Sequence, residues 1–238
     1  YLLPVSITGV SDGTAKNPTL STAYFLITGS YEPGNVPTEK VLQLEGGNQR
    51  SIFKYYNNLF THSEAGEIRS YPYSEDEDKF GSGGVISTGW DTYDLVVPYL
   101  DRWIVRWGPW TGGNNGYLNS YPVSPEGNIS PVVAGWFNSR FQVFDLIVPY
   151  QGNFLCRFPA GEIRRYPFSS SYIFSAGVSL GTGWQNFTQI LPYKNTLLCI
   201  DAAGNMWEYP VTPDGVVSPR RQVGSGWDIY RKVIPFGD

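Results

Sequence analysis

The sequence predicts an all-β fold, a five-bladed β-propeller, and three observations lead to this prediction. Short landmarks recur in a fixed order along most of the 238-residue chain, and one of them, a Gly-Trp pair, recurs every 43 to 48 residues. Between them lie short apolar or alternating runs separated by turns rich in Gly, Pro and Asn, which is typical of β-strands. The composition, with 41% hydrophobic and 16% charged residues, is that of a globular protein and argues against disorder.

Three landmarks define the repeat. A Gly-Trp pair comes first, at Gly89-Trp90, Gly135-Trp136, Gly183-Trp184 and Gly226-Trp227. A Pro-aromatic pair follows, at Pro98-Tyr99, Pro149-Tyr150, Pro192-Tyr193 and Pro235-Phe236. Its aromatic residue lies nine residues after the Trp in three repeats and fourteen after Trp136, which we interpret as an insertion beginning at Phe137. A Tyr-Pro pair completes the set, at Tyr71-Pro72, Tyr121-Pro122, Tyr166-Pro167 and Tyr209-Pro210.

A fifth copy is degenerate. Gly46-Gly47 occupies the Gly-Trp position, Tyr55-Tyr56 the Pro-aromatic position, and Tyr31-Glu32-Pro33 precedes them in place of Tyr-Pro. Repeats of 40 to 50 residues that carry about four strand signals and no helical period are typical of propeller blades. We therefore expect four antiparallel strands in each blade.

The two ends of the chain predict how the ring closes. Residues 230–236 have the pattern of a first strand with no blade after it, whereas residues 1–46 lack a first strand. We expect the C-terminal strand to join the N-terminal blade, because this closure removes open sheet edges. The expected product is a single domain over residues 1–238. Its blades are 228–238 plus 1–46, 47–90, 91–136, 137–184 and 185–227.

The order of Gly-Trp, apolar strand, Gly-containing turn, Tyr and Pro-containing turn resembles the tachylectin family of five-bladed propellers. This resemblance covers essentially the whole chain and implies a lectin that binds N-acetylated amino sugars, with one site in each blade. Blades of that family usually carry an Asp-Asn-Trp stretch before their last strand. The matching segments here, 75–79, 125–128 and 213–216, lack it. The fold inference survives this departure, but a specificity for N-acetylhexosamines does not follow.

Charge and hydropathy exclude some classes of partner. The formal net charge is −4, and Lys and Arg are scattered without a basic stripe, so we expect no nucleic-acid binding. No apolar run approaches the roughly 18 residues of a membrane span. The chain opens at Tyr1 without Met, which leads us to expect a processed, secreted or extracellular protein, with a cytoplasmic location as the alternative.

The candidate ligand-binding residues are mostly landmarks of the repeat. Aromatic faces suit the C–H faces of sugars, and Asp can accept hydrogen bonds from hydroxyl groups. For the landmark residues the alternative is structural: Trp in the core, Asp in turns and Tyr at strand ends. Trp110 differs, because it lies in a long Gly-rich turn where an exposed ring makes a good contact. The full set is Trp90, Asp91, Trp110, Tyr121, Trp136, Tyr166, Trp184, Tyr209, Trp227 and Asp228.

Few residues suggest catalysis or metal binding, so we expect no enzyme and no cofactor. His62 is the only histidine, which removes the usual His-based metal sites. Asp94 and Asp145 occupy equivalent positions on the first strands of neighbouring blades, so an acid pair of the glycosidase type remains an alternative. The acidic run 75–78 predicts a solvated loop, with weak calcium binding as the alternative.

Two further pairs of residues bear on covalent chemistry. Cys156 and Cys199 occupy the same position in neighbouring blades, so pseudo-symmetry points their side chains the same way around the ring. We therefore expect two buried free thiols and no disulfide. Asn128 and Asn186 begin glycosylation sequons, which matter only if the protein is secreted.

The sequence thus predicts a lectin with shallow, multivalent sites between blades and glycans as partners, including N-acetylated amino sugars. The first alternative is a non-catalytic structural or protein-interaction propeller without an active sugar site, and a protein partner or oligomer belongs to this alternative. A glycoside hydrolase is the third and least favoured hypothesis.

Overall fold

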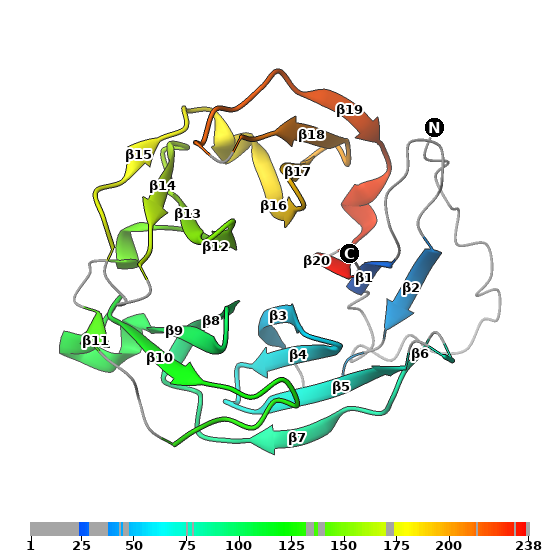
Figure 1. Ribbon diagram of the computed structural model, residues 1–238, viewed down its shortest axis with the longest axis vertical. Helices are drawn as coiled ribbons and strands as arrows, with labels where there is room; N and C mark the ends of the chain where they lie inside the picture. Colours follow the sequence, from blue (N-terminus) through cyan, green and yellow to red (C-terminus); the bar gives the residue numbers. More distant parts are fainter. Residues whose placement is uncertain are drawn as a thin grey trace. The chain divides into compact units, whose positions relative to one another are not determined.

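The computed structural model describes residues 24–28, 38–42, 44, 48–74, 76–77, 79–131, 136–137, 141–169, 174–212, 214–230 and 232–236. Their regular structure consists of β-strands and short 3-10 helices, so the predicted all-β class is confirmed (Figure 1). The chain divides into two compact units, residues 45–185 and residues 1–44 with 186–238. The degenerate landmarks Gly46-Gly47 and Tyr31-Glu32-Pro33 lie outside the described residues.

The unit of residues 45–185 contains three antiparallel sheets of the propeller-blade type. The first consists of β3 (Gln49–Tyr55), β4 (Asn58–Ser63), β5 (Ile68–Ser74), β6 (Lys79–Phe80) and β7 (Gly84–Ser87). The second consists of β8 (Tyr93–Tyr99), β9 (Arg102–Trp107), β10 (Leu118–Pro122) and β11 (Trp136–Phe137). The third consists of β12 (Leu146–Tyr150), β13 (Asn153–Arg157), β14 (Ile163–Pro167) and β15 (Val178–Ser179).

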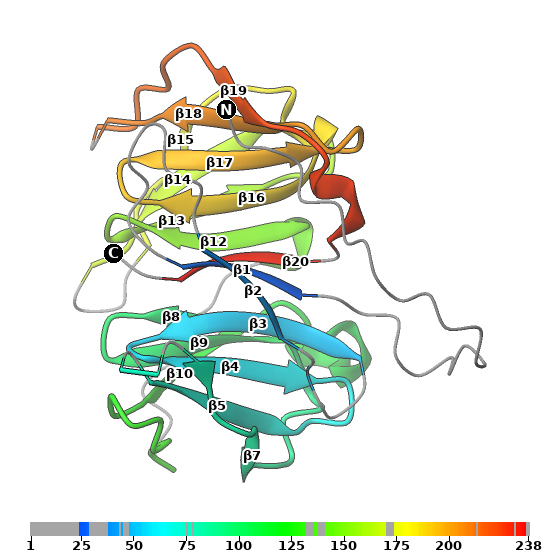
Figure 2. The ribbon, with the colours of Figure 1, turned by 90° about the vertical axis from the view of Figure 1, so that its right-hand side faces the viewer.

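The other unit contains one four-stranded and one three-stranded sheet. The four-stranded blade is built from β16 (Phe187–Tyr193), β17 (Thr196–Asp201), β18 (Met206–Pro210) and β19 (Arg221–Gly224). Its first three strands run side by side in Figure 2. The three-stranded sheet has the order β2-β1-β20, with β1 at Tyr24–Thr28, β2 at Thr38–Leu42 and β20 at Lys232–Phe236.

The propeller class is confirmed, but the predicted count of five four-stranded blades is not supported. Four sheets reach the strand number of a blade, and the N-terminal sheet has three strands among the described residues. The C-terminal strand β20 does pair with the N-terminal strand β1, as expected. The two strands run parallel, so the prediction of a purely antiparallel blade is wrong for this sheet.

The innermost strands of neighbouring blades lie side by side inside each unit. In the larger unit β3 packs beside β8, and β8 beside β12 (Figure 1). The Ser51 hydroxyl accepts a hydrogen bond from the backbone N–H of Val96 across the first of these junctions, at 2.9 Å. In the other unit Gln189 on β16 accepts from the N–H of Val233 on β20, at 2.7 Å. A polar side chain from one innermost strand therefore satisfies the backbone of the next.

The Pro-aromatic landmark marks the end of each innermost strand, where a tight hairpin begins. The next residue has a positive φ in four repeats: Tyr56 (48°), Leu100 (53°), Gln151 (47°) and Lys194 (49°). The favoured two-residue hairpin loops, types I′ and II′, require positive φ at their first central residue, a conformation that costs a non-Gly residue free energy. In the first repeat the landmark aromatic is Tyr55, so the assignment of Tyr55-Tyr56 to the Pro-aromatic position was wrong by one residue. The Tyr55 hydroxyl holds the next blade, because it donates to the carbonyl of Val123 at 2.7 Å.

A glycine turn of one blade receives the first residue of the next repeat. The N–H groups of Trp90, Trp184 and Trp227 donate to the carbonyls of Gly66, Gly161 and Gly204, at 3.1, 3.0 and 2.9 Å. These three tryptophans open the innermost-strand segments, and Trp184 and Trp227 begin short 3-10 helices, η3 (Trp184–Asn186) and η4 (Trp227–Ile229).

The fourth junction corrects one landmark. The predicted equivalent was Trp136, but the N–H that donates to the Gly116 carbonyl belongs to Phe141, at 3.3 Å. Phe141 begins the 3-10 helix η2 (Phe141–Val143) and lies nine residues before Tyr150, as the other landmark tryptophans lie before their aromatics. Trp136 instead forms part of the outermost strand β11. The inserted residues therefore precede the landmark, and the interpretation of an insertion after it was wrong.

Apolar side chains fill the space between the blades of the larger unit. Between the first two blades the core contains Phe53, Phe60 and Trp103, the last with no exposed area. A second cluster joins the next two blades and includes Phe154 and Cys156. Cys156 and Cys199 are both buried thiols, as predicted, and burial raises the pKa of Cys156. The repeated aromatics thus serve the packing of each blade against the next.

Candidate functional site

The landmark tryptophans belong to the core. Trp90, Trp184 and Trp227 retain only 6%, 5% and 7% of their surface. Trp90 also donates from Nε1 to the Ser87 hydroxyl at 2.7 Å, which fixes the edge of its ring. With their faces covered, these rings offer no platform for a sugar in this structure, in agreement with the structural alternative. The side chain of Trp136 lies outside the described residues.

The Tyr-Pro tyrosines contact the same cores from the side. The Tyr121 ring lies 4.9 Å from that of Trp90, and its hydroxyl is 2.7 Å from that of Tyr93. Burial and this hydrogen bond raise the pKa of Tyr93, so it stays protonated. Tyr166 packs against Phe144 with ring centroids 5.5 Å apart. These contacts place the tyrosines mainly in the packing between strands, with part of each ring exposed.

The two aspartates that follow landmark tryptophans are exposed beside glycine turns. A Cβ added to Gly66 would lie 2.4 Å from the backbone nitrogen of Asp91, and one added to Gly204 would lie 2.3 Å from Oδ1 of Asp228. The glycines therefore allow the backbone of one blade to approach the next repeat closely. Asp91 and Asp228 consequently stand at junctions between consecutive repeats, as a site between blades requires.

One predicted pair meets at the surface. Trp110 lies on the 3-10 helix η1 (Pro109–Asn114) and keeps 53% of its surface exposed. Its Nε1 donates to the backbone carbonyl of Asp91 at 3.0 Å. A Cβ on Gly108 would lie 2.5 Å from the indole ring, so glycine at this position lets the ring fold back against its own turn. Trp110 is thus held at its edge.

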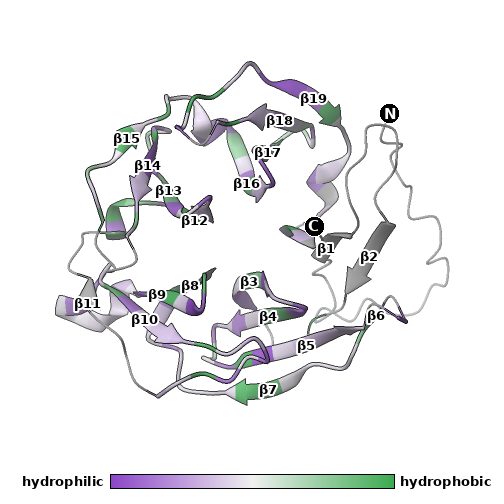
Figure 3. Cartoon of the chain, viewed as in Figure 1, coloured by the Kyte–Doolittle hydropathy of each residue, from purple (hydrophilic) through white to green (hydrophobic). Residues whose placement is uncertain are grey.

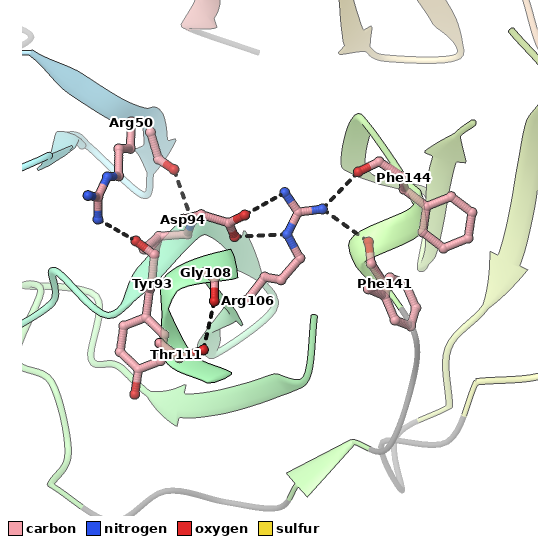
Figure 4. A network of polar contacts seen from close by, with 10 residues as sticks. Arg50, Tyr93, Asp94, Arg106, Gly108, Thr111, Phe141 and Phe144 are labelled. Atoms are coloured by element: carbon pink, nitrogen blue, oxygen red, sulfur yellow. Dashed lines mark hydrogen bonds and ion pairs between the residues drawn. The ribbon is translucent and has the colours of Figure 1, made fainter. Parts of the chain in front are cut away.

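Arg50, which sequence reasoning missed, completes this group. Its guanidinium carbon lies 4.4 Å from the centre of the Trp110 ring. Its Nη1 donates to the carbonyls of Asp91 and Tyr93, at 2.7 and 2.8 Å, and Figure 4 shows the contact with Tyr93. We call Arg50, Asp91 and Trp110 the Trp110 cluster. A signal for Arg50 existed, because it lies five residues before Tyr55, as Asp94 lies before Tyr99 and Asp145 before Tyr150.

The Trp110 cluster joins an exposed aromatic ring and a guanidinium to the backbone of Asp91, an exposed residue that carries a carboxylate. An indole ring can cover the apolar face of a sugar, and a carboxylate accepts hydrogen bonds from its hydroxyl groups. The cluster contains no nucleophile with an adjacent base, so its chemistry suits binding.

A second arginine–tryptophan pair lies in the other unit. The guanidinium carbon of Arg220 is 4.0 Å from the centre of the Trp207 ring. Trp207 donates from Nε1 to Asp201 at 2.9 Å, and Arg220 donates to the hydroxyl of the predicted residue Tyr209 at 3.3 Å. We call Arg220, Trp207 and Tyr209 the Trp207 cluster. Trp207 carries no landmark position, so the repeat gave no reason to select it.

The carboxylates considered for catalysis are both bound to arginine. Asp94 receives two hydrogen bonds from Arg106, at 2.8 and 2.9 Å (Figure 4). Asp145 receives two from Arg157, at 3.0 and 3.1 Å. Arg106 also donates to the carbonyls of Phe141 and Phe144 in the next repeat. These bidentate pairs account for the carboxylates structurally and link successive repeats.

The other hypotheses on acidic residues find little support in the described part of the chain. Asp76 and Glu77 are exposed, and Glu77 pairs with Lys79 at 2.8 Å, while Glu75 and Asp78 lie outside the described residues. No group of three or more His, Cys, Asp or Glu side chains suited to a metal ion occurs among the described residues. Calcium binding in this loop stays an untested alternative.

His62 is fully buried, with its Nε2 3.0 Å from the Trp90 carbonyl oxygen. Burial lowers the pKa of His62 to about 4, against an unfolded value of about 6.5. Between these two pKa values the unfolded chain therefore binds a proton at His62 and the folded protein does not. We expect the free energy of unfolding to fall by up to about 3 kcal/mol as pH drops from about 6.5 to about 4. Below pH 4 the contribution of His62 should change no further.

Urea unfolding of the wild type and His62→Leu between pH 7 and pH 4 measures this effect. Other carboxylates titrate in both proteins, so the difference between the two pH profiles isolates His62. Parallel profiles would contradict a buried neutral histidine.

Two remaining observations concern the surface. Asn128 and Asn186, which begin the sequons, are both exposed. Among the described residues, no helix has the length and apolar character needed to cross a membrane.

Comparisons with known proteins identify no family. No protein-family model matches the chain, and no curated protein matches it. Among solved structures, Prp20p from Saccharomyces cerevisiae is similar over 73% of this chain and 51% of its own, with 9% identity and a TM-score of 0.41. Human WBSCR16 is similar over 84% of this chain and 62% of its own, with 13% identity and a TM-score of 0.40. PorZ of Porphyromonas gingivalis is similar over 92% of this chain and 34% of its own, with 10% identity and a TM-score of 0.44. The chain thus spans 34% to 62% of these structures.

Proposed function

We propose that this protein is a non-catalytic carbohydrate-binding module whose principal site is the Trp110 cluster. The observation that carries the proposal is the exposure of Trp110, 53% of whose surface is open while its edge is fixed to Asp91. A ring held in place loses little conformational freedom when a ligand stacks on it. The exposed carboxylate of Asp91 then accepts hydrogen bonds from sugar hydroxyls.

The repeat architecture supports sites at junctions between blades. Asp91 and Asp228 stand at two such junctions, each beside a glycine turn. In this proposal the chain is a single five-bladed propeller closed by β20, resembling the tachylectin lectins, and it is secreted. Single sugar sites bind weakly, at about −4 to −6 kcal/mol, so several sites on one protein give avidity for clustered glycans.

A glycan array tests the proposal with two variants. Wild type is expected to bind a restricted set of saccharides, and Trp110→Ala to lose at least about 2 kcal/mol of binding free energy, roughly thirtyfold in Kd, because the stacking surface is gone. Tyr56→Ala is the matched control, since Tyr56 is also an exposed aromatic of the same unit, at 50%.

The control variant is expected to bind as the wild type does. Equal binding by Trp110→Ala and the wild type would remove the Trp110 cluster as the site. If the wild type binds no neutral, N-acetylated or acidic saccharide on the array, carbohydrate binding is contradicted altogether.

A second candidate function is a platform for protein partners. Its specific support is the outer strand β7, which Figure 3 colours as hydrophobic and whose Val85 and Ile86 are 45% and 43% exposed. Exposed apolar residues on an edge strand are unusual in a protein without a partner. Val85→Lys would weaken such a complex and leave glycan binding unchanged, which separates the two functions.

A further inference from the structure

Most arginines of the described residues are neutralised by a carboxylate. The ion pairs join Arg to Asp or Glu within 4.0 Å. In two of them the partners lie on neighbouring strands, Arg106 on β9 with Asp94 on β8 and Arg221 on β19 with Glu208 on β18. The arginines in these pairs are Arg69, Arg102, Arg106, Arg157, Arg164 and Arg221.

Arg50 and Arg220 differ from this set in the same two ways. Neither forms an ion pair with a carboxylate of the described residues, and each lies over the ring of a tryptophan. Their hydrogen-bond partners there are uncharged: two backbone carbonyls for Arg50 and the Tyr209 hydroxyl for Arg220. No carboxylate of the described residues therefore pairs with either guanidinium group at ion-pair distance.

We propose that Arg50 and Arg220 recognise an anionic group, carboxylate or sulfate, on the saccharides that bind at the Trp110 and Trp207 clusters. This inference rests on the proposed function and names its ligand class. The chain then holds two acidic-saccharide sites, one in each unit.

The chemistry of the guanidinium group favours this assignment. Arginine presents five N–H donors in one plane, and two parallel bonds to a carboxylate or sulfate use one edge of that plane. In Arg50 both bonds to carbonyls come from Nη1, so among the described residues Nε and Nη2 have no partner and are available to a ligand. Stacking on Trp110 and these two bonds hold the plane in one orientation before the ligand arrives, which lowers the entropy cost of binding.

The neighbouring groups suit a sugar that carries the anion. Beside Arg50, Asp91 accepts hydrogen bonds from hydroxyl groups and disfavours a second acidic substituent. Beside Arg220, Gln222 faces Trp207 across the β18–β19 pair and donates to Asn205 at 3.0 Å. Amide side chains of this kind donate to and accept from hydroxyl groups. The net charge of −4 disfavours unspecific attraction of polyanions, so the preference is for a single acidic group.

Calorimetric titration tests the inference with a uronic-acid disaccharide, a sulfated disaccharide and a carboxyl-reduced neutral disaccharide. Wild type is expected to bind two acidic ligands per chain, about tenfold more tightly than the neutral one, since charge-assisted hydrogen bonds are lost in the latter. The uronate and sulfated arms show which anion the sites prefer. Binding should also weaken as salt is raised.

Variants locate the charge. Arg50→Gln and Arg220→Gln are each expected to leave one site of acidic preference, and the double variant none. Arg164→Gln is the matched control, because Arg164 also lies over an aromatic ring, 5.2 Å from Phe158, but is paired with Glu162 at 2.9 Å. It should keep two sites and the full preference.

The outcomes separate this inference from the proposed function. Equal affinity of the wild type for acidic and neutral disaccharides overturns the anionic preference and leaves saccharide binding standing. Binding of neither class contradicts both. Retention of two acidic sites in the double variant also overturns the assignment. The comparison of acidic and neutral ligands is made on the wild type, so that test does not depend on whether a variant folds.

Discussion

Replacing Trp103 with Ala is expected to lower the free energy of unfolding by about 3–5 kcal/mol, the range for a fully buried large aromatic. Trp103 lies on β9 with no exposed surface. Its ring contacts aromatic rings from the preceding blade, Phe53 at 5.1 Å and Phe60 at 4.9 Å between centroids. Alanine would open a cavity between two blades that rigid neighbouring rings cannot collapse into. Urea unfolding followed by circular dichroism measures the loss.

Trp110→Ala is the internal comparison for this prediction. It removes the same side chain from the same unit, but from a position that is 53% exposed. Its cost should stay near 1 kcal/mol or below, as for most surface substitutions. Equal costs for the two variants would show that the junction between these blades is not the packed core described above.

Gly66→Ala is the second substitution with a large expected effect. Gly66 has φ of +78°, and a Cβ there would lie 2.4 Å from the backbone nitrogen of Asp91 and 2.9 Å from that of Trp90. Backbone atoms cannot rotate away, so the next repeat would have to move. We expect the free energy of unfolding to fall by about 2–4 kcal/mol. The left-handed conformation costs alanine about 1 kcal/mol, and the overpacking costs about 1–3 kcal/mol.

Gly89→Ala separates these two contributions. Gly89 has nearly the same φ, +82°, but a Cβ there would meet nothing within 4 Å. Its cost should therefore be the conformational part alone, about 1 kcal/mol. The difference between the two variants in thermal or urea unfolding measures the close approach between repeats. If the two costs are equal, the turn conformation alone requires glycine at position 66, and the close approach at the junction does not.

The sequence predicted the repeat well because each landmark has one physical task. Pro-aromatic pairs end innermost strands before tight hairpins, and glycines with positive φ let consecutive repeats approach closely. Both tasks depend on local backbone geometry, which short motifs encode. Strand order followed from this in three of the four full blades, where each strand pairs with the next along the chain, whereas in the first blade β6 and β7 both pair with β5.

Other features could not be read from local motifs. The Gly135-Trp136 pair matched the landmark by residue type, yet Phe141 occupies the position, because the spacing to Tyr150 decides which aromatic reaches the glycine turn. The parallel pairing of β1 with β20 joins the two ends of the chain, and nothing local indicates its direction.

The candidate site also contains one residue that a local motif indicated and one that only the fold reveals. Trp110 was found because an aromatic residue in a Gly-rich turn is unusual. Arg50 was missed because it stands in the degenerate repeat, 60 residues before Trp110 in the sequence. Only the folded structure places its guanidinium 4.4 Å from the indole ring and shows that it lacks a carboxylate partner among the described residues.

A crystal structure of the protein with its tightest-binding saccharide would show whether the Trp110 cluster is the principal site. We expect density for a sugar ring stacked on Trp110, with a hydroxyl group within hydrogen-bonding distance of the Asp91 carboxylate. Density for the saccharide elsewhere, with the Trp110 ring uncovered, would contradict the assignment of this cluster as the principal site.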